Sequence, residues 1–134
     1  MRKVLILGAG AGGTIVANML RHQIPESELE ITIIDKDEQH HYQAGYLFIP
    51  FGVYSPDDVI KSKKEFIPQG VEFIVDQVHK IDPDQRRVET LAGQYDYDWL
   101  VIATGCDIAP DEVEGMQESW QEDVFDFYTL EGAT

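Results

Sequence analysis

Apolar residues in the first third of the chain fall into blocks that predict a strand, a helix and a second strand. The apolar run Val4–Leu7 is followed by Thr14–Gln23, where apolar residues recur at helical spacing, and then by the apolar run Leu29–Ile34. Short apolar runs bounded by turn residues are typical of buried parallel strands, whereas i, i+3, i+4 spacing is typical of a helix with one buried face. We therefore expect a strand–helix–strand unit over residues 4–34.

The pattern farther along the chain predicts a second helix and a return to strands. Ser55, followed by Pro56 and two aspartates, is typical of a helix N-terminus, so a helix is expected from there to about Phe66. Apolar and alternating runs predict strands at residues 71–78, 87–91, 94–97 and 99–103, with the middle two joined as a hairpin through Ala92-Gly93. This order predicts an α/β fold: a parallel sheet flanked by helices, with an antiparallel hairpin inserted before the last strand. The first strand is expected in the centre of the sheet.

The turn between the first strand and its helix has the spacing Gly8-x-Gly10-x-x-Gly13. In a strand–turn–helix setting these glycines permit a tight turn, close approach of a pyrophosphate and close packing of helix on strand. The helix N-terminus presents free N–H groups and a positive dipole end to phosphates. Asp35 ends the second strand, 22 residues after Gly13, where a carboxylate can accept hydrogen bonds from ribose hydroxyls. The sequence therefore predicts a Rossmann-like dinucleotide site.

Two other interpretations of this N-terminal segment explain less. A glycine-rich turn without a ligand would leave the position of Asp35 unexplained. Arg2 and Lys3 before an apolar run resemble the start of a secretory signal. The run is too short before the glycines, however, and a helix-then-strand pattern continues, so we reject the signal.

Charge and cysteine content narrow the class of protein. The chain has 25 acidic and 10 basic residues and a formal net charge of −15, which argues against a nucleic-acid surface. No apolar stretch is long enough to cross a membrane. A single cysteine excludes an intrachain disulfide and indicates a reducing compartment, so a cytoplasmic location is expected.

The segment from Asp37 to Tyr54 is rich in aromatic, histidine and glycine residues and has no clean period. It is expected either to pack as ordinary core under a short helix or to form one wall of a ligand pocket. His40 and His41 do not predict a metal site, because adjacent histidines usually point apart and no partner stands at ligand spacing.

Two motifs together resemble the pyridine nucleotide–disulfide oxidoreductase superfamily. The first is the glycine turn with Asp35. The second is Tyr97–Gly105, which reads Tyr-Asp-Trp-Leu-Val-Ile-Ala-Thr-Gly and is similar to the family's Y-D-x-L-V-I-A-T-G signature. Phe73–Pro83 also resembles the family, in which the residue at Val78 contacts adenine through its backbone. The resemblance covers residues 2–131 and implies the first segment of an FAD-binding domain.

Within this superfamily the chain is most similar to sulfide:quinone oxidoreductases and flavocytochrome c sulfide dehydrogenase. The residues that carry this likeness are Asp35 and the aromatic segment His41–Gly52, whose family counterpart includes a proline and lies beside the flavin. Disulfide reductases of the glutathione reductase type are excluded, because no cysteine stands between Met1 and Gly105 to form their redox pair. Type II NADH dehydrogenases share the framework and remain an open alternative.

The resemblance implies a set of FAD-binding residues in the glycine turn, after the second strand and around the second motif. They are Gly8, Ala9, Gly10, Ala11, Gly12, Gly13, Asp35, Lys36, Pro50, Val78, Ala103, Thr104 and Gly105. It further implies a flavin oxidoreductase in which sulfide attacks a cysteine disulfide and electrons pass through FAD to a membrane quinone. An NAD(P)H-dependent flavin reductase is the first alternative, and a non-catalytic dinucleotide-binding module is the second.

The sequence departs from the family pattern near its end. Members of the family are longer, so we expect residues 1–110 to form the first FAD-binding segment and residues 111–134 a linker toward a second domain. The isolated chain is then expected to bind FAD weakly, to be inactive and to self-associate, and the longer parent to attach peripherally to a membrane. Tyr128 stands where many sulfide:quinone oxidoreductases have a cysteine. Cys106 is a weak catalytic candidate, since Asp107 beside it disfavours a reactive thiolate.

Overall fold

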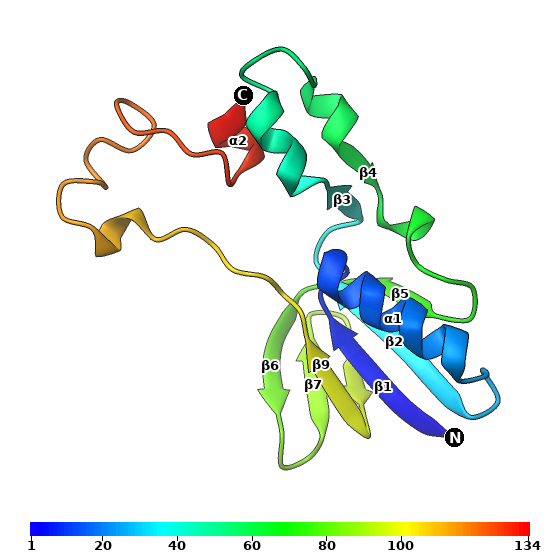
Figure 1. Ribbon diagram of the computed structural model, residues 1–134. Helices are drawn as coiled ribbons and strands as arrows, with labels where there is room; N and C mark the ends of the chain where they lie inside the picture. Colours follow the sequence, from blue (N-terminus) through cyan, green and yellow to red (C-terminus); the bar gives the residue numbers. More distant parts are fainter. The chain divides into compact units, whose positions relative to one another are not determined.

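A computed structural model describes residues 1–134 and contains a four-stranded parallel sheet (Figure 1). The strands are β1 (Arg2–Leu7), β2 (Leu29–Asp35), β5 (Glu72–Val75) and β9 (Trp99–Ile102), arranged in the order β5-β2-β1-β9. Val4 lies opposite Ile31 on one side and opposite Trp99 on the other. The predicted α/β class and the central position of the first strand are confirmed.

Helix α1 (Ala11–Gln23) covers one face of this sheet. Ala17, with Val16 and Leu20 beside it, packs against the sheet residues Ile6 and Ile33, both of which are fully buried. The helix begins three residues earlier than its apolar pattern predicts. The Thr14 N–H donates to the Gly10 carbonyl, so the first helical turn includes the glycine-rich segment.

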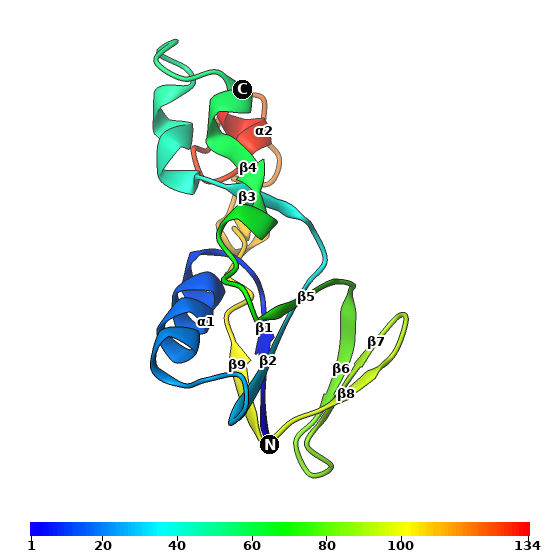
Figure 2. The ribbon, with the colours of Figure 1, turned by 90° about the vertical axis from the view of Figure 1, so that its right-hand side faces the viewer.

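A three-stranded antiparallel sheet covers the other face (Figure 2). It consists of β6 (Val78–Asp82), β7 (Arg87–Thr90) and β8 (Gln94–Asp96), and its buried Val88 packs against Leu5, Leu7 and Ile34 of the parallel sheet. The predicted hairpin is therefore part of a three-stranded sheet that is inserted in the chain between β5 and β9.

The single strand predicted over residues 71–78 is wrong: the chain leaves β5 at Asp76 and enters the antiparallel sheet at β6. The Asp76 carboxylate accepts hydrogen bonds from the N–H groups of Gln77 at 2.8 Å and Ala92 at 3.1 Å. These bonds fix the chain where it changes sheets.

The helix predicted from Ser55 to Phe66 is also wrong. The Ser55–Asp58 capping box forms, but it starts only the short 3₁₀ helix η2 (Pro56–Val59), which is followed by strand β4 (Ile60–Ser62) and 3₁₀ helix η3 (Lys63–Glu65). Strand β4 pairs with β3 (Gln39–His41), and this pairing requires extended backbone where a helix was expected.

The chain forms two compact units, residues 1–40 with 62–105 and residues 41–61 with 106–134. The second unit contains the 3₁₀ helices η1 (Gln43–Phe48), η2 and η4 (Pro110–Glu112) and the short helix α2 (Leu130–Ala133). Its core is formed by Tyr46, Val59 and Ala133. Tyr46 is thus core, while Phe51 and Val53 of the same aromatic segment are exposed. None of the helices is long and apolar enough to cross a membrane.

Candidate functional site

The carboxyl ends of the central strands meet at the glycine turn. The Gly8 N–H donates to the Ile34 carbonyl at the end of β2, and the Ala103 N–H donates to the Leu7 carbonyl at the end of β1, both at 2.8 Å. Ligands of open α/β sheets bind at this end of the strands. A pocket of about 240 Å³ lies here, lined by Leu7, Gly8, Ile34, Asp35, Lys36, Asp76, Gln77, Val78 and Thr104.

Five of the residues predicted to bind cofactor therefore line one pocket although they come from four separate segments: Gly8, Asp35, Lys36, Val78 and Thr104. Residues Ala9 to Gly13 continue from Gly8 into the first turn of α1, and Ala103 and Gly105 flank Thr104. Pro50 belongs to the second unit and is not among the residues that line the pocket. The cofactor contacts of all these residues remain predictions.

Gly8 and Gly13 are required by the packing of the chain itself. Gly8 has φ +95°, and a Cβ there would overlap the Ala103 carbonyl. A Cβ on Gly13 would overlap the Gly8 carbonyl oxygen. These two glycines let the turn, α1 and the residue after β9 approach one another at backbone distance.

Gly10 is different, because the chain's own packing does not explain it. Its φ of −74° and ψ of −165° suit any residue, and a Cβ there would meet nothing within 4 Å. Gly10 is the N-cap of α1, yet no side chain caps this helix and its first turn contains no acidic residue. Open space in front of an uncapped helix N-terminus suits an approaching pyrophosphate. The structure thus fits the group that the sequence predicts.

Asp35 is held at the junction of the glycine turn and β2 by three donors. Its Oδ2 accepts from the Ala9 N–H at 2.6 Å, and its Oδ1 accepts from the Asp37 N–H at 3.0 Å. The Lys63 ammonium lies 2.9 Å from Oδ1. A carboxylate has roughly four acceptor positions, so about one position on Oδ2 remains for a ligand hydroxyl.

The same contacts set the charge of Asp35. Burial raises the pKa of the Asp35 carboxyl, but the hydrogen bond from Lys63 and those from the backbone of Ala9 and Asp37 outweigh it, so the pKa lies below its usual value. Asp35 is therefore an anion at neutral pH and can only accept hydrogen bonds.

Sequence reasoning missed three residues of this region: Lys63, Asp76 and Gln77. Lys63 stands in the run Lys61-Ser-Lys-Lys64, which is typical of a solvated segment, and no local signal marks it as the buried partner of Asp35. Asp76 and Gln77 lie inside the run read as one strand, and only the break between β5 and β6 brings them to the pocket.

Cys106 and Tyr128, both singled out in the sequence, lie together in the second unit. The Cys106 Sγ is 3.0 Å from the Tyr128 hydroxyl, which also donates to the Cys106 carbonyl at 3.0 Å. The hydrogen bond with Cys106 raises the pKa of the Tyr128 hydroxyl. The Cys106 thiol is exposed.

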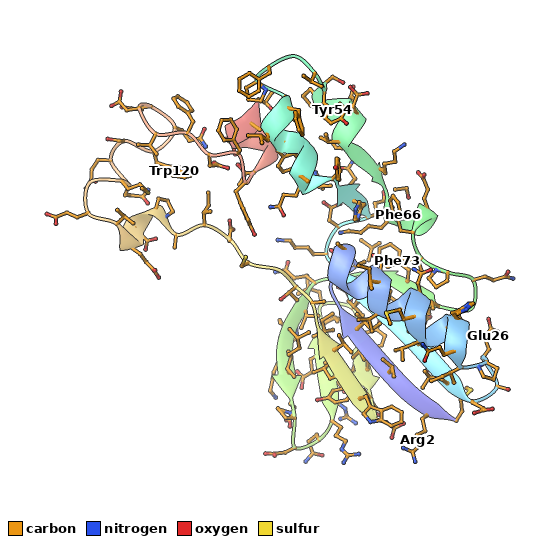
Figure 3. All side chains as sticks on the ribbon, in the orientation of Figure 1. Arg2, Glu26, Tyr54, Phe66, Phe73 and Trp120 are labelled. Carbon is orange, nitrogen blue, oxygen red and sulfur yellow. The ribbon has the colours of Figure 1, made fainter.

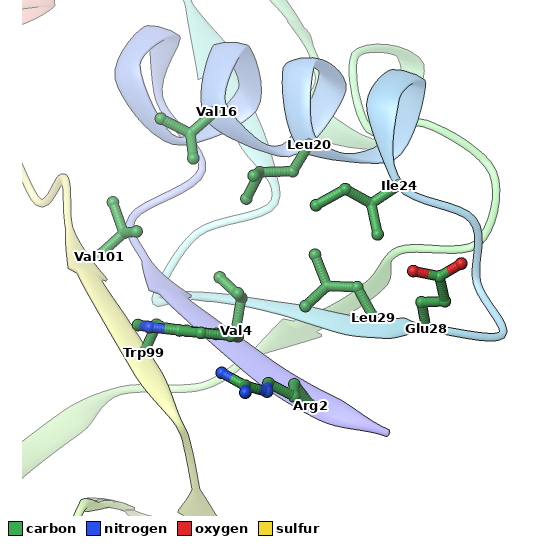
Figure 4. A pocket seen from close by; sticks show the side chains of 9 residues that line it. All are labelled: Arg2, Val4, Val16, Leu20, Ile24, Glu28, Leu29, Trp99 and Val101. Atoms are coloured by element: carbon green, nitrogen blue, oxygen red, sulfur yellow. The ribbon is translucent and has the colours of Figure 1, made fainter.

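A larger pocket of about 580 Å³ lies between α1 and the sheet (Figure 4). Val16 and Leu20 of the helix, and Ile24 directly after it, face Val4 of β1 and Val101 of β9 across it. Arg2 lies over the Trp99 ring, 5.0 Å from its centre. The lining is mostly apolar, with Arg2 and Glu28 as its charged residues, and it includes no residue of the glycine turn.

Comparison with known proteins identifies the family to which the chain belongs. The family profile of the pyridine nucleotide-disulphide oxidoreductases matches residues 2–132. The chain belongs to this family. This membership agrees with the resemblance carried by Gly8–Gly13, Asp35 and Tyr97–Gly105.

Individual relatives in this family carry two different names. The chain is 36% identical over 118 residues to the mitochondrial sulfide:quinone oxidoreductase of Dictyostelium discoideum and 38% identical over 119 residues to the type II NADH:quinone oxidoreductase of Staphylococcus aureus, each match covering 87% of the chain. Among solved structures, the sulfide:quinone oxidoreductase of Aquifex aeolicus matches 99% of the chain with a TM-score of 0.81 and 29% identity.

The chain spans 26%, 29% and 30% of the lengths of these three relatives, respectively. NDH2 from Plasmodium falciparum matches with a TM-score of 0.71 at 17% identity, which shows a shared fold alone.

Proposed function

We propose that residues 1–105, excluding the segment 41–61, hold the ADP half of FAD in an oxidoreductase that reduces a quinone. The observation that carries this proposal is Gly10, whose Cβ direction is open although its backbone does not need glycine. The N–H groups at the start of α1 would bind the pyrophosphate, and the remaining acceptor position of Asp35 would orient the ribose. Val78 lies in the same pocket, where its backbone would face the adenine.

The protein's own part in such a reaction is to bind and orient the cofactor. FAD, when bound, supplies the electron-transfer chemistry. Gly8, Ala9 and Gly13 are buried, as are the ends of strands β1 and β2, and this keeps the pyrophosphate donors fixed in direction. The pocket of about 240 Å³ holds an adenosine part rather than a whole dinucleotide, so we expect residues 1–134 alone to bind FAD weakly.

Sulfide is the electron donor that we propose first. The support is the likeness to the Aquifex sulfide:quinone oxidoreductase, with a TM-score of 0.81 over 99% of the chain, and the sequence match to the Dictyostelium sulfide:quinone oxidoreductase. NADH is the second candidate, because the Staphylococcus NADH:quinone oxidoreductase is as similar in sequence as the Dictyostelium sulfide:quinone oxidoreductase. A quinone acceptor is common to both names.

Two measurements test the proposal. Titration of the purified chain with FAD and, separately, with NADH should show the tighter binding for FAD. Gly10→Val should weaken it strongly, while Ala109→Val, at an exposed position in the second unit, should not. Preference for NADH would refute the cofactor assignment. For the donor, the polypeptide expressed from the complete gene is loaded with FAD and assayed for quinone reduction with sulfide or NADH, and activity with NADH alone would refute the sulfide assignment.

A further inference from the structure

Lys63 is a buried cation that contacts the candidate site from a distant segment of the chain. Its ammonium lies 2.9 Å from Oδ1 of Asp35 and donates to the Asp37 carbonyl at 2.7 Å. The Lys63 side chain is only 8% exposed and that of Asp35 14% exposed. The two residues thus form a desolvated ion pair beside the pocket.

The burial of Lys63 is selective within its own segment. Lys61 and Lys64 are exposed, so the same stretch of chain keeps two of its three lysines in water. Burying an ammonium costs several kcal/mol unless partners compensate, and a buried ion pair seldom adds more stability than apolar residues of similar volume. Stability alone therefore does not account for Lys63 at this position.

The backbone around Lys63 is fixed from several directions. The Lys63 N–H donates to the Glu38 carbonyl at 2.8 Å, and Asn18 of α1 donates through its side chain to the Phe66 carbonyl at 2.9 Å. Phe66, labelled in Figure 3 near α1, packs its ring 4.6 Å from that of His40. The ammonium is consequently delivered to Asp35 by a segment anchored to both α1 and the chain after β2.

The charge of Asp35 is a difficulty for a phosphate site. Asp35 hydrogen-bonds the Ala9 N–H inside the glycine turn, so an uncompensated carboxylate there would stand beside the path of a diphosphate. Asp76 adds a second carboxylate to the same pocket, and Lys36 is the exposed cation in its lining. Unit charges a few Å apart interact by several kcal/mol in a partly buried setting.

We propose that Lys63 is a positioning residue of the dinucleotide site, which cancels the charge of Asp35 and holds its carboxylate against the Ala9 N–H with one acceptor position turned to the ligand. This inference rests on the proposed binding of FAD. Lys63 is not among the residues that line the pocket, so it acts on the ligand through Asp35.

The test uses the complete 134-residue chain with three variants. Lys63→Met removes the charge at similar length, Lys63→Arg retains it, and the exposed Lys64→Met is the matched control. FAD affinity is measured by titration from pH 5 to pH 8. The backbone amide resonances of Ala9 and Asp37, whose N–H groups bind the Asp35 carboxylate, are followed by NMR during acid titration without FAD.

In the wild type the two amides should titrate below the usual pKa of aspartate, and in Lys63→Met their midpoint should rise by about 1–3 pH units because the opposite charge is gone. Lys63, Lys36, Asp37 and Asp76 are the charged groups near Asp35, and only the first is changed. Loss of a charge-assisted contact to the site's carboxylate should weaken FAD binding by roughly tenfold at pH 7. Lys63→Arg should recover most of the affinity, and Lys64→Met should match the wild type.

The outcomes separate this inference from the function on which it rests. If the wild type binds FAD and Lys63→Met binds it equally well, the role of Lys63 is refuted and the function stands. If the amide midpoints do not move in Lys63→Met, the role of Lys63 is refuted whatever the measured affinities for FAD. If the midpoints move but neither the wild type nor any variant binds FAD at the high concentrations used for NMR, the cofactor assignment fails. The ion pair between Lys63 and Asp35 then still stands.

Discussion

Gly13→Ala should mainly destabilise the fold, whereas Gly10→Ala should mainly weaken FAD binding. At Gly13 the new Cβ would overlap the Gly8 carbonyl oxygen, and only backbone movement of the turn or of α1 can relieve this. Overpacking of this kind costs about 3 kcal/mol or more when backbone must shift, out of a typical total stability of about 5–15 kcal/mol. Gly13→Ala should therefore remove a large part of the stability of the first unit.

At Gly10 the added methyl group meets nothing within 4 Å and the backbone angles are ordinary. A gain from lower unfolded-state entropy and a loss at the N-cap position nearly cancel, so the net change should stay within about 1 kcal/mol. Gly10→Ala should nevertheless weaken FAD binding, because the methyl group points into the space proposed for the pyrophosphate.

Urea unfolding followed by circular dichroism measures the difference in stability. With a slope of about 1.5 kcal/mol/M, a loss of 3 kcal/mol lowers the unfolding midpoint by about 2 M, whereas 1 kcal/mol shifts it by less than 1 M. FAD titration of the folded Gly10→Ala protein completes the test. Equal destabilisation by the two substitutions, or unchanged FAD binding by Gly10→Ala, would refute this division of roles.

Four further predictions concern Asp35, Asp126 and the sheet edge. Asp35→Ala should weaken FAD binding by roughly tenfold to a hundredfold through loss of a charge-assisted hydrogen bond, and equal affinities would remove Asp35 from the site. Because the Asp35 pKa is lowered in the folded state, its contribution to stability is present above its unfolded pKa of about 3.9 and is lost as the pH falls through the lower folded value; acid unfolding of Asp35→Asn should lack this step. Asp126 accepts from the N–H groups of Tyr128 and Thr129, so Asp126→Ala should lower the stability of the second unit by about 1–2 kcal/mol, as measured by proteolysis or hydrogen exchange. Strand β9 is an edge whose Ile102 is 61% exposed, so the chain should self-associate in sedimentation experiments and Ile102→Lys should reduce this; a wild-type monomer at high concentration would contradict it.

The parts of the fold that sequence predicts well are those fixed by local signals. The run Val4–Leu7, the glycine spacing and the end of β2 at Asp35 are each encoded within a few residues, and the structure confirms their order and pairing. The helix signal at Ser55 is equally local and forms its capping box, but pairing of β4 with β3 ends the helical conformation after four residues. In this segment the pairing of strands outweighed the local propensity to form a helix.

The candidate site shows the same division. Gly8, Asp35 and Val78 could be placed because motif spacing and resemblance point to them, and the structure brings them to one pocket. Lys63 could not, because its role depends on an ion pair with a residue 28 positions earlier, and lysine in a lysine-rich run predicts solvent exposure. Buried ion pairs leave no periodic trace in a single sequence.

The close packing of Gly8 on the Ala103 carbonyl has a consequence for synthesis of the protein. The two residues are 95 positions apart, and β1 receives its second neighbour, β9, only after the whole antiparallel insertion has been made. While the chain leaves the ribosome, the apolar central strand therefore has one unpaired edge for the time needed to translate nearly 70 residues after β2, several seconds at about 5–20 residues per second. Nascent chains halted before residue 103 should thus engage chaperones that recognise exposed strands, and those halted well beyond it should be released.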